Sequence, residues 1–197
     1  MITEQDIPSR LDAQMAFLQE IDKLKAVDRA TDVFGDRAEN SAEHSWHLAL
    51  YALILSEHAR SQINVDRVIR MMLLHDIVEI DAGDTPIFGA ADPGIKDAEE
   101  KAAKRIFGLL PDDQAREALA LWHEFEAAES VDAIFAKSLD RFQPPNQNLA
   151  TGGGSWKRYK VTRDRIEARV KPPIERGAPK LFAWLSPKLD AFFSRSE

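Results

Sequence analysis

The chain has 197 residues, 44% hydrophobic and 30% charged, with a formal net charge of −7. This length fits a single domain over residues 1–197, with a flexible N-terminus expected at 1–8. The negative charge, without a long run of Lys and Arg, argues against a nucleic-acid polymer as partner. The absence of cysteine excludes disulfides and thiolate metal sites, and the cytoplasm is the expected compartment.

The first half of the chain predicts three helices. Apolar residues recur every three or four positions over 10–27, the period of an amphipathic helix. A second helix is predicted over 39–59, because Asn40 three residues before Glu43 is typical of a capping box. Its apolar run at 48–55 is far shorter than the ~20 residues that span a bilayer, so it predicts a buried helix and no membrane partner. A third helix is predicted over 64–80, ending before Gly83.

The second half predicts further helices separated by loops. Helical patterns cover 97–110, 113–130, 130–142 and 178–193. The Gly, Pro and Asn content of 81–94 and 142–156 predicts two long loops, a kind of segment that is often functional. No alternating strand pattern stands out, so the predicted fold class is all-α.

Four residues on these predicted helices offer the donors that a divalent cation prefers. Neutral imidazoles and carboxylates from converging elements form a suitable mixed set. A His-Asp pair near a helix C-terminus also gains from the helix dipole, which favours a positive ion there. The candidate ligands are His44, His75, Asp76 and Asp140.

Each candidate also has a simpler interpretation. A lone histidine such as His44 is more often a half-buried polar residue than a ligand, and Asp140 could pair with Lys137 or Arg141 on a solvated face. The joint occurrence of all four favours the metal site, and Glu79 shares a helix face with the His-Asp pair, where it could transfer protons.

Segments 24–47, 73–86 and 136–142 resemble the HD-domain superfamily of metal-dependent phosphohydrolases, close to the small 5'-deoxynucleotidase-like HD hydrolases. The resemblance covers most of residues 15–185 and implies an HD-domain helical bundle. It implies one divalent ion, with Mn or Co favoured and Mg, Zn or Fe possible, held by His44, His75, Asp76 and Asp140.

The resemblance also implies catalytic roles for three residues. Arg29 is expected to grip the phosphate from a loop, and Glu79 to handle protons near the attacking water. Asp84 is expected to contact the sugar or orient the water. Ala30 departs from the family pattern, which has Trp beside that arginine, and this leaves sugar and base preference open.

The implied activity is removal of phosphate from a phosphomonoester, with a (deoxy)nucleoside 5'-monophosphate as the favoured small substrate. The alternatives are a non-catalytic, regulatory protein that binds metal and nucleotide, and a diiron HD oxygenase. His123 is the only histidine between the His-Asp pair and Asp140, which favours one metal ion over two. The family and apolar stretches such as 181–185 suggest a homodimer.

One further segment, 151–158, carries three consecutive glycines before Lys157 and Arg158. Its backbone N–H groups and these cations could bind an anion, as glycine-rich loops do. The glycines could equally provide a turn between helices. Both interpretations remain open at this stage.

Overall fold

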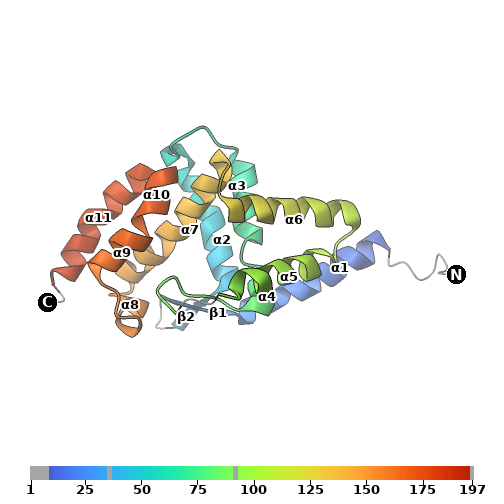
Figure 1. Ribbon diagram of the computed structural model, residues 1–197, viewed down its shortest axis with the longest axis horizontal. Coiled ribbons are helices and arrows are strands. Elements are labelled where there is room, and N and C mark those ends of the chain that lie inside the picture. The colour runs from blue at the N-terminus through green and yellow to red at the C-terminus, as the bar shows by residue number, and fades with distance from the viewer. Residues whose placement is uncertain (1–8, 35–36, 91–92, 196–197) are drawn as a thin grey trace.

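A computed structural model of the chain describes residues 9–34, 37–90 and 93–195. Helices dominate these residues, so the all-α prediction is confirmed (Figure 1). The segment 1–8, expected to be a flexible N-terminus, lies outside the described residues. Within the described ranges, none of the helices has the length and hydropathy to cross a bilayer.

The elements of the first half are a helix, a two-stranded ribbon and the helices that follow it. Asn40 caps the helix that directly follows the ribbon. Its side chain accepts a hydrogen bond from the Glu43 N–H (2.9 Å), and its own N–H donates to the Glu43 carboxylate (3.2 Å). The predicted capping box is therefore confirmed. In order, the elements are α1 (Arg10–Ile21), the 3₁₀ helix η2 (Asp22–Ala26), β1 (Asp28–Val33), β2 (Arg37–Asn40), α2 (Ser41–Leu55), the 3₁₀ helix η3 (Ser56–His58), α3 (Val65–Leu74) and α4 (Glu79–Ala82).

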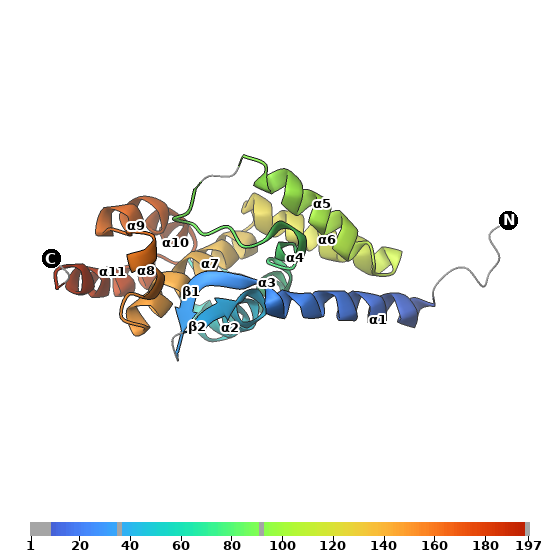
Figure 2. The same cartoon turned by 90° about the horizontal axis from the view of Figure 1, so that it is seen from below.

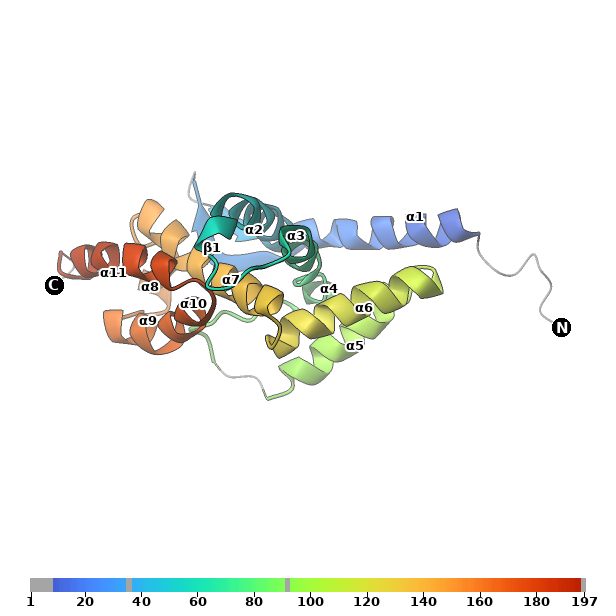
Figure 3. The same ribbon diagram turned by 90° about the horizontal axis from the view of Figure 1, so that it is seen from above.

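The second half consists of helices alone among the described residues. Figure 3 shows the first two lying side by side, and the last three gather at the C-terminal end of the molecule. These elements are α5 (Ile95–Phe107), α6 (Asp112–Ala127), α7 (Val131–Ala150), α8 (Gly154–Arg158), α9 (Arg163–Arg169), α10 (Lys171–Gly177) and α11 (Pro179–Phe193).

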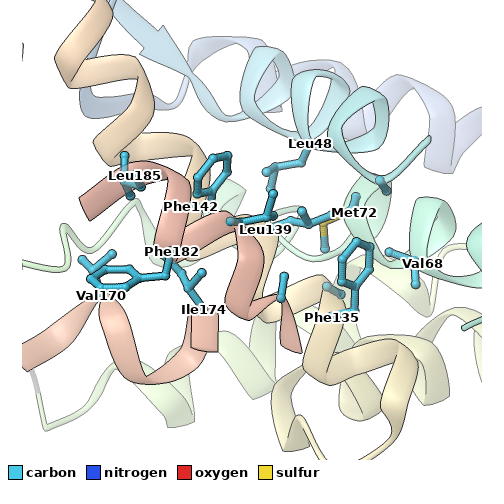
Figure 4. Packing of buried hydrophobic residues seen from close by; sticks show 14 of the residues in the cluster. Leu48, Val68, Met72, Phe135, Leu139, Phe142, Val170, Ile174, Phe182 and Leu185 are labelled. Atoms are coloured by element: carbon cyan, nitrogen blue, oxygen red, sulfur yellow. The ribbon is translucent and has the colours of Figure 1, made fainter. Parts of the chain in front are cut away.

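The larger hydrophobic core forms around α7. Leu48 of α2, Met72 of α3 and Leu139 of α7 are fully buried and converge there (Figure 4). On the opposite side, Ile174 of α10 and Leu185 of α11 cover the same helix. Burying each such side chain contributes about 1.5–3 kcal/mol, so α7 is held in place from several directions.

A second core joins α1, α5 and α6. Phe17, Phe107 and Trp122 are buried in it, together with Ile77 and Val78, which follow the His-Asp pair. Because α3 belongs to the first core, the short segment between α3 and α4 is anchored in both cores. This anchoring fixes the position of the predicted metal-binding turn.

The two-stranded ribbon of β1 and β2 is an element that the sequence pattern did not predict. β1 and β2 pair antiparallel, with Asp32 opposite Ala38 and Val33 opposite Arg37, and Figure 2 shows them beside α2. These strands are short and polar. They therefore lack the hydrophobic alternation by which a strand is recognised in a sequence.

The prediction of a loop over 142–156 is wrong for most of this segment. Helix α7 continues to Ala150, although Pro144 and Pro145 lack the N–H groups that would donate to the carbonyls of Asp140 and Arg141. Phe142, Pro145 and Asn148 are buried. The packing of these buried side chains offsets the hydrogen bonds that the prolines cannot form, so the helix continues through both prolines.

The apolar run at 48–55 was predicted to be a buried helix, and only part of it is. Leu48 and Ala52 belong to the core, but Leu53 and Ile54 are 54% and 67% exposed. Helix α2 therefore presents one apolar face to the core and a second to the surface.

Candidate metal centre

The turn that carries His75 and Asp76 replaces part of the helix predicted over 64–80. Helix α3 ends at Leu74, and the N–H groups of Ile77 and Ile80 then donate to carbonyls three residues back, at 3.3 Å each. Such bonds tighten the backbone relative to an α-helix. The tightened turn and α4, which begins at Glu79, direct these side chains to one place.

Three predicted ligands from separate elements meet in the interior. His44 of α2, His75 and Asp140 of α7 are buried and each offers one donor atom within 4.8 Å of the others. Asp140 Oδ1 lies 3.3 Å from His44 Nε2 and 3.9 Å from His75 Nε2. Asp76 lies beside this group of three: its Oδ1 is 3.0 Å from His75 Nε2, and its other oxygen, Oδ2, is 3.9 Å from His44 Nε2.

The hydrogen bonding of His75 tests whether this set fits a cation. His75 Nδ1 donates to the Met72 carbonyl at 2.9 Å, so in the neutral imidazole, the form that binds a metal, the Nε2 lone pair faces the carboxylates of Asp76 and Asp140. This buried Nε2 has no hydrogen-bond partner within the described residues. A lone pair facing carboxylates is unfavourable unless a cation lies between them. Two donors bound about 2.1 Å from one ion lie about 3–4 Å apart, so the residues fit a divalent ion.

Arg29 lies beside this cluster and is surrounded by carboxylates. It is part of strand β1 rather than the expected loop, and its Nη1 is 2.6 Å from Asp76 Oδ2, 3.4 Å from Glu79 Oε1 and 3.7 Å from Asp84 Oδ1. Its Nε is 3.8 Å from Glu39 Oε2. Burial lowers the pKa of Arg29, but the carboxylates of Asp76, Glu79, Asp84 and Asp140 outweigh burial and raise it. Arg29 is therefore a permanent positive charge.

Glu79 and Asp84 are carboxyl groups that hold protons more strongly than usual. Burial, and then the neighbouring Asp76 carboxylate, raise the pKa of Glu79 to about 8 against the opposing charge of Arg29. Burial likewise raises the pKa of Asp84. The Ser41 hydroxyl donates to Glu79 Oε2 and orients this carboxyl. A carboxyl group with a pKa near neutrality can both take and give a proton.

The sequence analysis missed Glu39, which connects Arg29 to the metal cluster. Its side chain in β2 is 2% exposed. Its Oε2 lies 3.3 Å from His44 Nδ1, and its Oε1 accepts a hydrogen bond from Gln143 Nε2 at 2.8 Å. A carboxylate behind a ligand histidine fixes the ring and increases its basicity. Burial and the charge of Arg29 lower the pKa of His44, but the carboxylates of Asp140, Glu39 and Asp76 outweigh both and raise it to about 9.

We expect Glu39→Gln to weaken binding of a divalent ion by about 10- to 100-fold, because the charge behind His44 is lost while the side-chain shape is kept. Competition with a chromogenic chelator measures this affinity. The matched control is Glu57→Gln, an exposed glutamate in η3 that should leave the affinity unchanged. An unaltered affinity in Glu39→Gln would show that Glu39 does not support His44.

A cavity of about 70 Å³ adjoins the cluster, and Arg29, Asp84 and Asp140 are part of its wall. A water molecule needs roughly 10–15 Å³ of cavity volume, so this cavity has room for about five water-sized atoms. A phosphoryl group is of this size. The rest of the wall is mostly apolar and includes Ala30, Ile87, Phe88, Pro144, Pro145, Trp156 and Tyr159.

The glycine-rich segment 151–158 forms a turn over 151–153, directly after α7, and continues as helix α8. Gly153 has φ +101°, and a Cβ atom there would approach Phe192 Cζ to 2.7 Å, so a side chain at this position would be strained and crowded. Arg158 donates to the Ala30 carbonyl at 2.6 Å and to Asp32 Oδ1 at 2.8 Å. Its guanidinium therefore holds strand β1, which supports the structural interpretation of this segment.

Comparison with known proteins identifies the family. A sequence model of the HD domain matches residues 21–182. A crystal structure described as a predicted metal-dependent phosphohydrolase from Magnetospirillum magnetotacticum MS-1 is 49% identical, with a TM-score of 0.91, and covers 100% of this chain and 98% of that chain. The human protein named 5'-deoxynucleotidase HDDC2 is 33% identical over 130 residues, and so is its mouse counterpart.

The human match covers 64% of this chain and 62% of the human protein, and the mouse match covers 64% of each. This chain therefore spans about six-tenths of the length of these curated relatives. The family match extends over most of the chain and includes every residue of the cluster. The chain belongs to the HD-domain family.

Proposed function

We propose that this protein is a metal-dependent phosphohydrolase that removes phosphate from a phosphomonoester, and that its substrate is a (deoxy)nucleoside 5'-monophosphate. The names of the human and Magnetospirillum relatives support the reaction class. The observation that carries the proposal is the unpartnered His75 Nε2, which faces carboxylates beside a cavity the size of a phosphoryl group.

In this proposal one divalent ion is held by four side chains. Nitrogen and oxygen donors without sulfur suit Mn, Co, Fe, Mg and Zn, and we favour Mn or Co. When bound, such an ion supplies Lewis-acid polarisation of a phosphoryl oxygen and lowers the pKa of water at the site. The proposed ligands are His44, His75, Asp76 and Asp140.

The remaining roles fall to residues around the cluster. Glu79, whose pKa of about 8 is close to neutrality, takes a proton from the attacking water and returns one to the leaving oxygen. Asp84 lines the cavity and orients the water or contacts the sugar. Arg29, fixed among carboxylates, stabilises the charge on the phosphoryl oxygens in the transition state.

The cavity is the size of a phosphoryl group, so the sugar and the base would extend beyond it, past its apolar lining. Ala30 faces the cavity with only a methyl group, and the aromatic side chains of the wall come instead from Phe88, Trp156 and Tyr159. Phe88 and Tyr159 can contact a base or a sugar, whereas Trp156 is 4% exposed and its ring stacks on Phe193. Ala30 leaves room beside Arg29, so we propose that ribo- and deoxyribonucleotides are both accepted.

Phosphate release from a substrate panel tests the function. The chain is stripped of metal, reloaded separately with Mn, Co, Mg, Zn and Fe, and assayed with ribo- and deoxyribonucleoside 5'-monophosphates and with non-nucleotide phosphomonoesters. We expect Mn or Co to support release from nucleoside monophosphates. Inertness of all these esters with all five metals would remove the phosphohydrolase assignment.

We also propose that the protein is a cytoplasmic homodimer. Within the apolar stretch 181–185, Leu181, Phe182 and Leu185 are buried, so the stretch does not require a partner as the sequence suggested. Trp184 is 49% exposed, however, and with Leu50 and Ile54 it lines a hollow between α2 and α11. Exposed apolar surface of this kind favours self-association. Sedimentation should show twice the 22.2 kDa chain mass; the chain mass alone would exclude the dimer.

A further inference from the structure

Arg141 follows Asp140 on helix α7, and both residues line the cavity beside the cluster. Its Nη1 lies 3.8 Å from Asp140 Oδ2, and no hydrogen bond joins its guanidinium to any other part of the chain that the structure describes. The side chain is 38% exposed. Arg141 therefore has donors available on the cavity side.

The other guanidinium in the cavity wall, that of Arg29, is in a different situation. Its side chain is 12% exposed and lies within 4 Å of four carboxylates. Because these carboxylates offset its charge, Arg29 contributes little net attraction to an incoming anion, although its guanidinium can still donate hydrogen bonds to phosphoryl oxygens. The sequence resemblance assigned the phosphate contact to Arg29 alone, whereas Arg141 is the less neutralised of the two cations.

Counting charges shows why a second cation is needed. A divalent ion and Arg29 together carry three positive charges, and four surrounding carboxylates carry four negative charges even when Glu79 is left out. A phosphate dianion would add two more negative charges in a place shielded from water, where like charges repel strongly. The four carboxylates counted here are those of Glu39, Asp76, Asp84 and Asp140.

The two oxygens of Asp140 connect the metal cluster to Arg141. Oδ1 faces His44 and His75, whereas Oδ2 faces the Arg141 guanidinium. An anion bound at the cluster therefore lies within reach of Arg141, and a guanidinium can contact two phosphoryl oxygens at once.

We propose that Arg141 is a substrate-binding residue that contacts the phosphoryl oxygens in the cavity and makes the site selective for dianionic phosphomonoesters. This role deepens the proposed function and depends on the same site. Arg141 offsets charge that is already present on the bound ester. Loss of Arg141 should therefore raise KM more than it lowers kcat.

Calorimetric titration of inorganic phosphate into the Mn-loaded full chain tests whether Arg141 binds the phosphoryl group, and it does not require turnover. For Arg141→Ala we expect a phosphate Kd about 10- to 100-fold weaker than that of the unaltered protein, with unchanged metal content. Arg141→Lys should recover part of the loss, because it restores a charge without the two-pronged geometry. The matched control is Arg70→Ala, which removes an exposed arginine paired with Glu117 on another face.

The role would be overturned if Arg141→Ala bound phosphate as tightly as the unaltered protein, or if the unaltered protein bound none. It would also be overturned if Arg141→Ala lost its metal, because Arg141 would then only support Asp140. The hydrolysis assay tests the proposed function independently of this role. If phosphate binding depends on Arg141 but no ester of the substrate panel is hydrolysed, the enzyme assignment is wrong and Arg141 remains an anion-binding residue.

Discussion

Asp140→Asn is expected to abolish both binding of the divalent ion and hydrolysis. The substitution keeps the side-chain size but removes the charge that lies 3.3 Å from His44 Nε2 and 3.9 Å from His75 Nε2. Metal content after reloading should fall from one ion per chain to a small fraction. Ligand binding stabilises a folded chain by about 2.7 kcal/mol at a hundred times Kd, so added metal should raise the melting temperature of the unaltered protein and not that of the variant.

Asp113→Asn is the matched control for this substitution. Asp113 is an exposed carboxylate that pairs with Arg10, in α1, at 2.8 Å. Its loss should leave metal content, the thermal response to metal and hydrolysis unchanged. If Asp140→Asn retained one ion per chain at the affinity of the unaltered protein, Asp140 would not be a ligand.

Glu79→Gln is expected to reduce hydrolysis by about 10²- to 10⁴-fold while metal content stays at one ion per chain. Glutamine fills the same space and can still accept a hydrogen bond from Ser41, but it cannot take a proton. Burial and the Asp76 carboxylate raise the pKa of Glu79 to about 8, and a bound cation would lower it. The rate of the unaltered protein should therefore rise with pH below about pH 8, as Glu79 loses its proton.

The pH profile separates this role from a structural one. In Glu79→Gln the rising limb should disappear, because no titrating group remains at that position. Glu126→Gln, which removes a carboxylate paired with Lys137 at 2.8 Å, should retain the limb and the rate. A Glu79→Gln variant with the full rate and the same limb would contradict a proton-transfer role for Glu79.

The convergence of His44, His75 and Asp140 was predictable from sequence because these residue types are informative in themselves. Histidine and aspartate are rarely buried together without a partner, and the helical period placed His44, His75 and Asp140 on elements that could converge. Their meeting within 4.8 Å follows from the packing of α2 and α3 against α7. Spacing alone did not show the tight turn after Leu74, which depends on Ile77 and Val78 entering the second core.

The support around the cluster was harder to predict. Glu39 and Arg29 lie on a ribbon whose strands are short and polar, and such strands become stable only through contact with the rest of the fold. Pro144 and Pro145 are strong signals for a loop, yet the buried residues of α7 override them. Local propensity is a weak guide where packing from several sides decides the conformation.

The surface of α2 illustrates a further limit of the sequence pattern. An apolar run predicts burial, but a helix inside one chain buries only the face that meets its own core. Leu53 and Ile54 remain exposed because no other described element covers that face. Whether such residues contact another copy of the chain depends on a second molecule, and a single sequence carries no direct signal for it.

Anomalous diffraction from crystals of the Mn-loaded protein tests the central claim most directly. We expect one anomalous peak per chain, about 2.0–2.2 Å from His44 Nε2, His75 Nε2 and one carboxylate oxygen each of Asp76 and Asp140. A peak held by other residues, two peaks in the site, or no peak among these side chains would contradict it.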